Sequence, residues 1–128
     1  MAHKPLISIV DDDAAFRNAT KGLARALGFA AEAFESAVEF LKFGQLHDTA
    51  CLIADVQIPQ MSGLDLHYQL VASGVSIPTI LMTAYASDRM QALAVEIGVV
   101  CILTKPFGKD TLLGCINSAL DRGQAQTV

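Results

Sequence analysis

LISIVDDD, at residues 6–13, decides the fold: a short apolar run ends at three consecutive aspartates. A run of this length, rich in Leu, Ile and Val, is typical of a buried β-strand. Apolar residues then recur at helical spacing over residues 16–27, and Gly28 is a natural stop for that helix. A buried strand, an acidic turn and an amphipathic helix together indicate the first unit of an α/β fold.

The same alternation continues to the end of the chain. Strands are predicted at residues 6–10, 30–34, 51–54, 79–83 and 99–103, and helices at about 16–27, 36–43, 64–72, 87–97 and 112–120. This order predicts a three-layer, flavodoxin-like α/β fold with a parallel sheet of order 2-1-3-4-5. One domain is expected over residues 1–122, with a polar tail or the start of a linker at 123–128.

Composition excludes several classes of protein. The formal net charge is -4, so we expect no direct contact with nucleic acid, which requires clustered basic side chains. No apolar run approaches the about 18 residues that span a bilayer, and no signal peptide is recognisable. The three cysteines Cys51, Cys101 and Cys115 lack the C-x-x-C spacing of a metal site. We therefore expect buried thiols and a cytoplasmic protein without membrane contact.

Polar residues stand where the predicted strands end. Asp11 and Asp12 follow the first strand, Asp55 follows the third, Thr83 ends the fourth and Lys105 follows the fifth. The carboxyl ends of parallel strands share one edge of the sheet, so these side chains should meet there. Crowded carboxylates repel one another unless a cation joins them, and oxygen ligands of this kind suit Mg²⁺.

Such a site is suited to phosphoryl transfer onto a carboxylate. The transferring group carries negative charge on three oxygens, which Mg²⁺, the Lys105 ammonium and the Thr83 hydroxyl can each contact. Asp55 is the predicted nucleophile, because it stands alone at the end of the central strand. For Asp13, a helix-capping role is the expected one.

Four short motifs resemble the receiver (chemotaxis-regulator-like) domain of response regulators. They are Ile9-Val10-Asp11-Asp12-Asp13, Asp55 with Pro59 and Met61-Ser62-Gly63, Met82-Thr83-Ala84, and Thr104-Lys105-Pro106-Phe107. Their order is specific, and the resemblance covers residues 6–120. The chain looks most like receivers that precede a helix-turn-helix output domain.

The resemblance implies a role for each site residue. Asp55 accepts a phosphoryl group from a phosphohistidine on a sensor histidine kinase. Asp12 and Asp55 bind Mg²⁺ directly, with the Gln57 backbone carbonyl as the third protein ligand, and Asp11 acts through a metal-bound water. Thr83 and Lys105 contact the phosphoryl oxygens.

Other implications concern the switch. The Lys105-Pro106 bond is expected to be cis, which is a modest cost only before proline. The family often has Phe or Tyr three residues before this lysine, where it moves inward together with the threonine. This chain has Ile102 there, which places the aromatic switch in doubt. Tyr85 is expected either to gate the site or to be an ordinary exposed aromatic.

The resemblance also implies partners. We expect two-component signal transduction and transcription regulation, with the chain catalysing its own phosphorylation and slow dephosphorylation rather than acting as a turnover enzyme. A homodimer through the fifth strand and its flanking helices, and a DNA-binding effector domain following the chain, are the expected assemblies.

Three alternatives remain open at this point. A pseudo-receiver that only binds partners would need no phosphorylation. An aspartyl-phosphate hydrolase of the haloacid dehalogenase type would use Asp11-x-Asp13, although Ala15 replaces the Thr or Val of its motif. A flavin-binding flavodoxin would need a Ser/Thr/Gly phosphate loop in place of the three aspartates.

Overall fold

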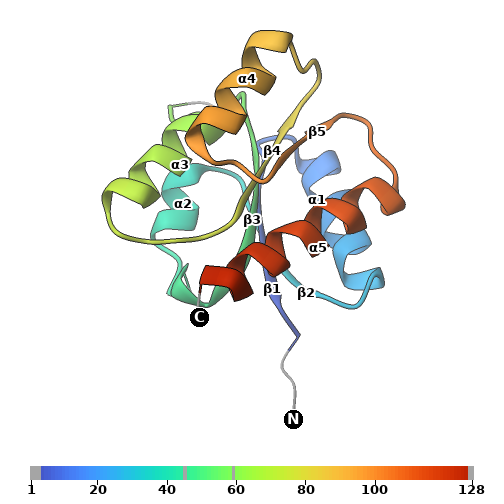
Figure 1. The fold of residues 1–128 in the computed structure, drawn as a ribbon. Helices are drawn as coiled ribbons and strands as arrows, with labels where there is room; N and C mark the ends of the chain where they lie inside the picture. Colours follow the sequence, from blue (N-terminus) through green and yellow to red (C-terminus); the bar gives the residue numbers. More distant parts are fainter. Residues whose placement is uncertain (1–3, 45, 59, 127–128) are drawn as a thin grey trace.

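A parallel sheet with helices on both faces forms the molecule (Figure 1). The computed structural model describes residues 4–44, 46–58 and 60–126, with the backbone alone for residues 123–126. The sheet has five strands in the order β2-β1-β3-β4-β5. Their bounds are Leu6–Val10 for β1, Ala30–Phe34 for β2, Thr49–Asp55 for β3, Thr79–Thr83 for β4 and Cys101–Thr104 for β5. The predicted fold class and strand order are confirmed.

Two helices cover one face of the sheet and three cover the other. The bounds are Ala14–Ala26 for α1, Ala37–Leu41 for α2, Gly63–Ala72 for α3, Asp88–Ile97 for α4 and Lys109–Gln126 for α5. One core cluster packs β1, β3, β4 and β5 against α1 and α5. Two further clusters pack the opposite face against α2 and α3, and against α4. The central strands are buried on both faces, which explains their near-continuous apolar sequences.

Local sequence determines where the helices begin. The side chains of Asp13, Ser36, Ser62 and Ser87 each accept a hydrogen bond from the backbone N–H three residues later, at the start of α1, α2, α3 and α4. Such N-caps satisfy amide groups that have no partner within the helix. The capping role expected for Asp13 is therefore confirmed. Gly98 ends α4 in the left-handed region, with φ 83°.

Several boundaries differ from the predicted ones. β3 begins two residues earlier than predicted and includes Asp55, because it is paired on both sides, with β1 and with β4. A 3₁₀ turn at Leu46–Asp48 was not predicted. α5 continues to Gln126, so the boundary predicted at residue 122 falls inside this helix. Residues 127–128, and Pro59 of the second motif, lie outside the described residues.

The cysteines differ from the expectation of three thiols. Cys101 of β5 and Cys115 of α5 form a disulfide, with their Cα atoms 6.4 Å apart. Cys51 is a buried, free thiol in β3. The sequence could not predict the pair, because the contact depends on which side of α5 faces β5. Among the described residues, no helix combines the length and apolar character needed to cross a bilayer.

Candidate functional site

Two buried carboxylates face each other at the carboxyl ends of β1 and β3. Asp11 directly follows β1 and is 0% exposed, while Asp55 ends β3 and is 7% exposed. The two strands are neighbours in register, with Val10 opposite Ala54. Parallel pairing therefore brings together two aspartates that are far apart in the sequence, as the strand-end pattern predicts.

Lys105 supplies the cation that joins these carboxylates. Its Nζ donates a hydrogen bond of 2.8 Å to Asp11 Oδ2 and a second, short one to Asp55 Oδ2. Lys105 follows β5, its backbone N–H donates to the Thr83 carbonyl at 2.7 Å, and its bond to Pro106 is cis, as the resemblance implies. The predicted meeting of Asp11, Asp55 and Lys105 is present in the structure.

The carboxylates keep the Lys105 ammonium charged. Burial alone lowers the pKa of Lys105, but the hydrogen bonds to Asp11 and Asp55 and the charges of both groups outweigh burial. The net result is a pKa above the ordinary value of lysine. The charge that the site needs opposite an anion is therefore held in place before any ligand arrives.

Backbone amides orient the two carboxylates further. The N–H of Gln57 donates to Asp55 Oδ1 at 2.7 Å, and the N–H of Asp13 donates to Asp11 Oδ1 at 3.0 Å. Each carboxylate thus has one oxygen fixed by the backbone and the other bonded to Lys105. Arg17 of α1 donates to the Asp11 carbonyl at 2.9 Å, which holds the acidic turn against the helix.

Gly63 provides space directly beside Asp55. A Cβ at this position would lie 2.7 Å from the Asp55 backbone oxygen and 3.1 Å from Leu81 Cδ2. Only a glycine allows the start of α3 to approach the end of β3 this closely. The Met61-Ser62-Gly63 motif predicts a turn here, but the sequence alone did not predict this contact.

The hydroxyl of Thr83 lies outside the Lys105 network. It donates to the Tyr85 carbonyl at 3.1 Å and accepts from the Tyr85 N–H at 3.3 Å. Thr83 nevertheless ends β4, next to β3, so it belongs to the same sheet edge. Tyr85 is 76% exposed. In this structure the Thr83 hydroxyl therefore bonds to the backbone of Tyr85.

Asp12 is exposed and lines a separate hollow of about 260 Å³ together with Glu35, Ser36 and Gln60. Among the described residues, no three His, Cys, Asp or Glu side chains are arranged as a metal site. In this arrangement Lys105 lies between Asp11 and Asp55, and Asp12 faces solvent beside them. Gln57 is exposed next to Asp55, where its carbonyl was predicted to bind the metal.

Sequence reasoning missed an aromatic contact. The Lys105 Nζ lies 4.2 Å from the centroid of the Phe16 ring, and the Phe16 and Phe107 rings meet edge to face at 5.5 Å. Phe16 was assigned to the apolar face of the first helix, and it does pack against the core. The sequence does place Phe16 in the first turn of α1, three residues after Asp13, and this proximity to the aspartates is the feature from which a contact with the site could have been predicted.

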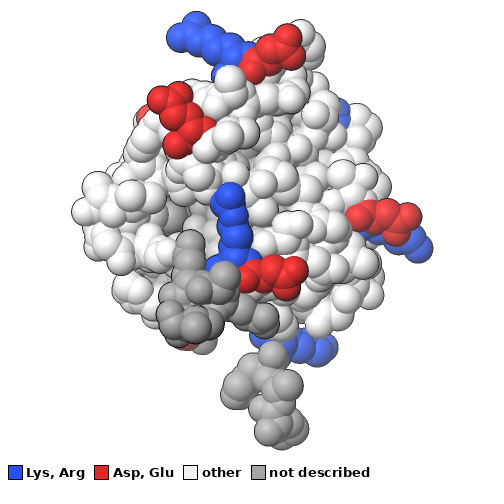
Figure 2. All heavy atoms as spheres, viewed as in Figure 1, with Lys and Arg blue, Asp and Glu red and all other residues white. Residues whose placement is uncertain are grey.

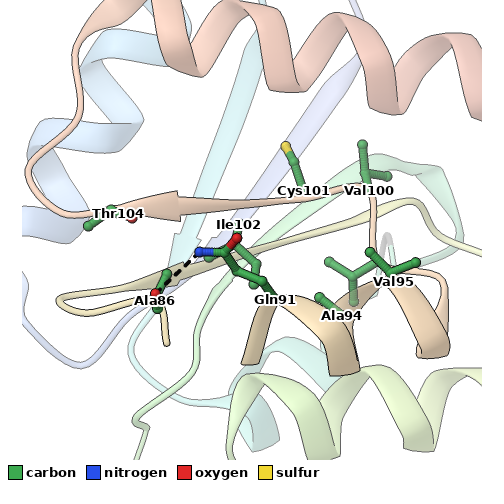
Figure 3. A pocket seen from close by; sticks show the side chains of 9 residues that line it. Ala86, Gln91, Ala94, Val95, Val100, Cys101, Ile102 and Thr104 are labelled. Atoms are coloured by element: carbon green, nitrogen blue, oxygen red, sulfur yellow. Dashed lines mark hydrogen bonds between the residues drawn. The ribbon is translucent and has the colours of Figure 1, made fainter. Parts of the chain in front are cut away.

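A shallow hollow of about 290 Å³ lies between α4 and β5 (Figure 3). Ile102 of β5 contributes to its wall, opposite Ala94 and Val95 of α4, and Gln91 Nε2 donates to the Ala86 carbonyl at 3.3 Å. Ile102 also packs in the cluster beneath α4. Ile102, three residues before Lys105, is thus an aliphatic side chain that packs against α4. Figure 2 shows isolated charges and wide uncharged areas on the face that carries α4 and α5.

Comparison with known proteins gives consistent matches. Residues 7–117 match the family described as the response regulator receiver domain. The response regulator protein TodT of Pseudomonas putida is 41% identical over 115 residues, which is 90% of this chain and 51% of TodT. The transcriptional regulatory protein FixJ of Bradyrhizobium diazoefficiens is 31% identical over 124 residues, 97% of this chain and 60% of FixJ. The chain spans about half the length of the curated relatives it matches.

Solved structures agree. The response regulator StyR superimposes with a TM-score of 0.86 and 34% identity, covering 97% of this chain and 63% of StyR. The crystal structure of FixJ-N superimposes with a TM-score of 0.82 and 29% identity, covering 94% of this chain and 96% of that one.

Proposed function

This chain belongs to the response regulator receiver domain family of two-component, phosphorylation-based signalling, and we propose that Asp55 is its phosphoryl acceptor in a Mg²⁺-dependent reaction. The observation that carries the proposal is the Lys105 ammonium bonded to both Asp55 and Asp11. A cation held against a buried carboxylate is what a transferring phosphoryl group requires.

Asp55 is suited to act as the nucleophile. One of its oxygens is fixed by the Gln57 N–H, and the other lies on the side of Lys105. In the proposed step this carboxylate forms a bond to phosphorus, while the bond from phosphorus to the donor nitrogen or oxygen breaks and the donor keeps the electron pair. Lys105 then neutralises charge on a phosphoryl oxygen. The chain promotes its own phosphorylation and slow dephosphorylation, and like its family it is not a turnover enzyme.

The donor set fits Mg²⁺. Asp11, Asp12, Asp55 and the Gln57 carbonyl offer oxygen atoms only, which is the preference of a hard cation. Asp11 and Asp55 already share one positive charge, and Asp12 faces solvent beside them, where a hydrated ion can be reached. When bound, Mg²⁺ would supply charge neutralisation for one phosphoryl oxygen. We propose Asp12, Asp55 and the Gln57 carbonyl as direct ligands and Asp11 as a ligand through water.

The hydroxyl of Thr83 connects the site to α4. Its partner Tyr85 precedes Ser87, the N-cap of α4. A phosphoryl group on Asp55 offers Thr83 a charged acceptor in place of the Tyr85 carbonyl, and charge-assisted hydrogen bonds are the stronger ones. Once the Thr83 hydroxyl bonds to the phosphoryl group, the segment from Thr83 to Ser87 would be released from it. The equilibrium among positions of α4 would then shift, and Ile102, which packs against α4, would move with this helix.

We propose a sensor histidine kinase as the phosphoryl donor and a cytoplasmic location. A homodimer through β5, α4 and α5, and a helix-turn-helix output domain beyond residue 128, are further parts of the proposal. The large uncharged area of this face and the exposed Val95 favour such a contact (Figure 2). The net charge of -4 leaves DNA contact to the output domain.

Intact-mass measurement with acetyl phosphate tests the function. With Mg²⁺, the protein should gain one phosphoryl group; with a chelator it should gain none. Asp55→Asn should abolish the gain, while Asp13→Asn, which preserves a capping side chain, should label normally. Equal labelling of Asp55→Asn would refute the choice of acceptor. A parent protein that never labels would favour the pseudo-receiver, and many turnovers of a phosphomonoester would favour the hydrolase.

A further inference from the structure

The ammonium of Lys105 has one partner that binds neither a metal ion nor a phosphoryl group. Two of its partners are the carboxylates of Asp11 and Asp55, and the third is the face of the Phe16 ring, 4.2 Å away at the centroid. An aromatic face carries partial negative charge, and it attracts an ammonium most strongly when both are partly removed from water. Lys105 meets that condition, because its side chain is 17% exposed.

The ring of Phe16 is held in position on several sides. Its backbone N–H donates to the Asp13 side chain at 3.2 Å, which fixes it in the first turn of α1. Its edge-to-face contact with Phe107, at 82° between the planes, ties the ring to the segment that follows Lys105. Both rings pack against the core cluster beneath α1 and α5. The aromatic face is therefore part of a rigid framework.

This contact matters when the anionic partners of Lys105 change. In the proposed reaction, Asp11 and Asp55 would help to hold Mg²⁺, and the Asp55 carboxylate becomes an acyl phosphate. The ammonium must then leave the carboxylates without leaving the site. The Phe16 face competes for neither the metal nor the phosphoryl group, so it can hold the ammonium throughout.

We propose that Phe16 is the positioning residue of Lys105: its ring face keeps the ammonium aimed at the phosphoryl group while the carboxylates exchange partners. The inference rests on the proposed phosphorylation of Asp55 and extends it. Loss of a partly desolvated cation–π contact should slow phosphorylation by about twofold to about thirtyfold.

Graded fluorination of the ring separates this role from packing. Phenylalanines with one, two and five ring fluorines at position 16 keep the shape of the ring nearly constant and progressively weaken its negative face. With acetyl phosphate and Mg²⁺, the labelling rate should fall stepwise along this series. Phe16→Tyr, which retains the face, should label at close to the parent rate. The same fluorinated residues at Phe43, which packs on the opposite face of the sheet, should leave the rate unchanged.

A double-mutant cycle and a spectrum complete the test. In a Lys105→Met background, fluorination of Phe16 should have no effect on the residual rate, because no ammonium remains to be held. In the parent, the ε-methylene protons of Lys105 should show an upfield ring-current shift by NMR that Phe16→Leu abolishes. If the labelling rate does not change with fluorination of Phe16, or if fluorination still slows labelling in Lys105→Met, the positioning role of Phe16 is wrong, while the proposed function stands. A parent that does not label at all contradicts the proposed function itself.

Discussion

Replacing Gly63 with alanine tests the close packing that places Asp55. The added methyl would lie 2.7 Å from the Asp55 backbone oxygen, 3.2 Å from its carbonyl carbon and 3.1 Å from Leu81 Cδ2. The nearest atom belongs to the backbone of a central strand, which cannot turn aside as a side chain can. Overpacking of this kind costs about 1–3 kcal/mol, while alanine regains at most about 1 kcal/mol in helix preference. With the full gain in helix preference, a net loss of about 0–2 kcal/mol remains, together with slower labelling of Asp55.

Two other helical glycines provide the control. At Gly22 of α1 and Gly114 of α5, an added Cβ would meet nothing within 4 Å apart from the neighbouring residues and backbone of its own helix. Alanine at either position should raise the free energy of unfolding by about 0.5–1 kcal/mol. Urea unfolding of the three variants and the parent measures the difference directly. If Gly63→Ala were as stable as the two controls, the contact with the Asp55 carbonyl would not exist as described.

Three more predictions concern stability. Burial raises the pKa of the Cys51 thiol to about 12 from 9.0, so between these pH values the folded chain keeps a proton that the unfolded chain loses. Over this range the free energy of unfolding should therefore fall with rising pH, by up to about 4 kcal/mol more than in Cys51→Ala. Equal pH slopes for the two proteins in urea unfolding would contradict this prediction. Under denaturing, non-reducing conditions, thiol titration should find one free thiol, that of Cys51, whereas three thiols would rule out the disulfide. Reduction should free Cys101 and Cys115 and lower the free energy of unfolding by about 3 kcal/mol, the value for a closed loop of about 15 residues. Ser62→Ala removes the capping box of α3 and should cost about 1 kcal/mol, whereas Ser62→Asp should cost little; equal losses would argue against the cap.

The fold was predictable because its strands are apolar on both faces and punctuated at their ends. β1, β2 and β4 begin and end at the predicted residues, and the caps at Ser36 and Ser87 were recognisable from local sequence. β5 was placed two residues too early, because residues 99–100 are as apolar as the strand itself but Val99 packs under α4 instead. Apolar character alone cannot separate these two kinds of burial.

The site was predictable to the extent that strand ends determine it. Asp11, Asp55 and Lys105 meet because parallel neighbours end at one edge. The present partner of the Thr83 hydroxyl was not predictable, because it depends on the conformation of the following loop. Nor was the Phe16 contact, which requires the rotation of α1 relative to β5. The sequence thus predicts which side chains lie at the same edge of the sheet, whereas the hydrogen bonds between their atoms depend on the three-dimensional structure.

Reductive trapping tests the central claim most directly. Borohydride converts an aspartyl phosphate into homoserine, which peptide mass spectrometry assigns to one position. After treatment with acetyl phosphate and Mg²⁺, we expect homoserine at position 55 and at no other aspartate. Homoserine at Asp11 or Asp12, with residue 55 still an aspartate, would contradict the account.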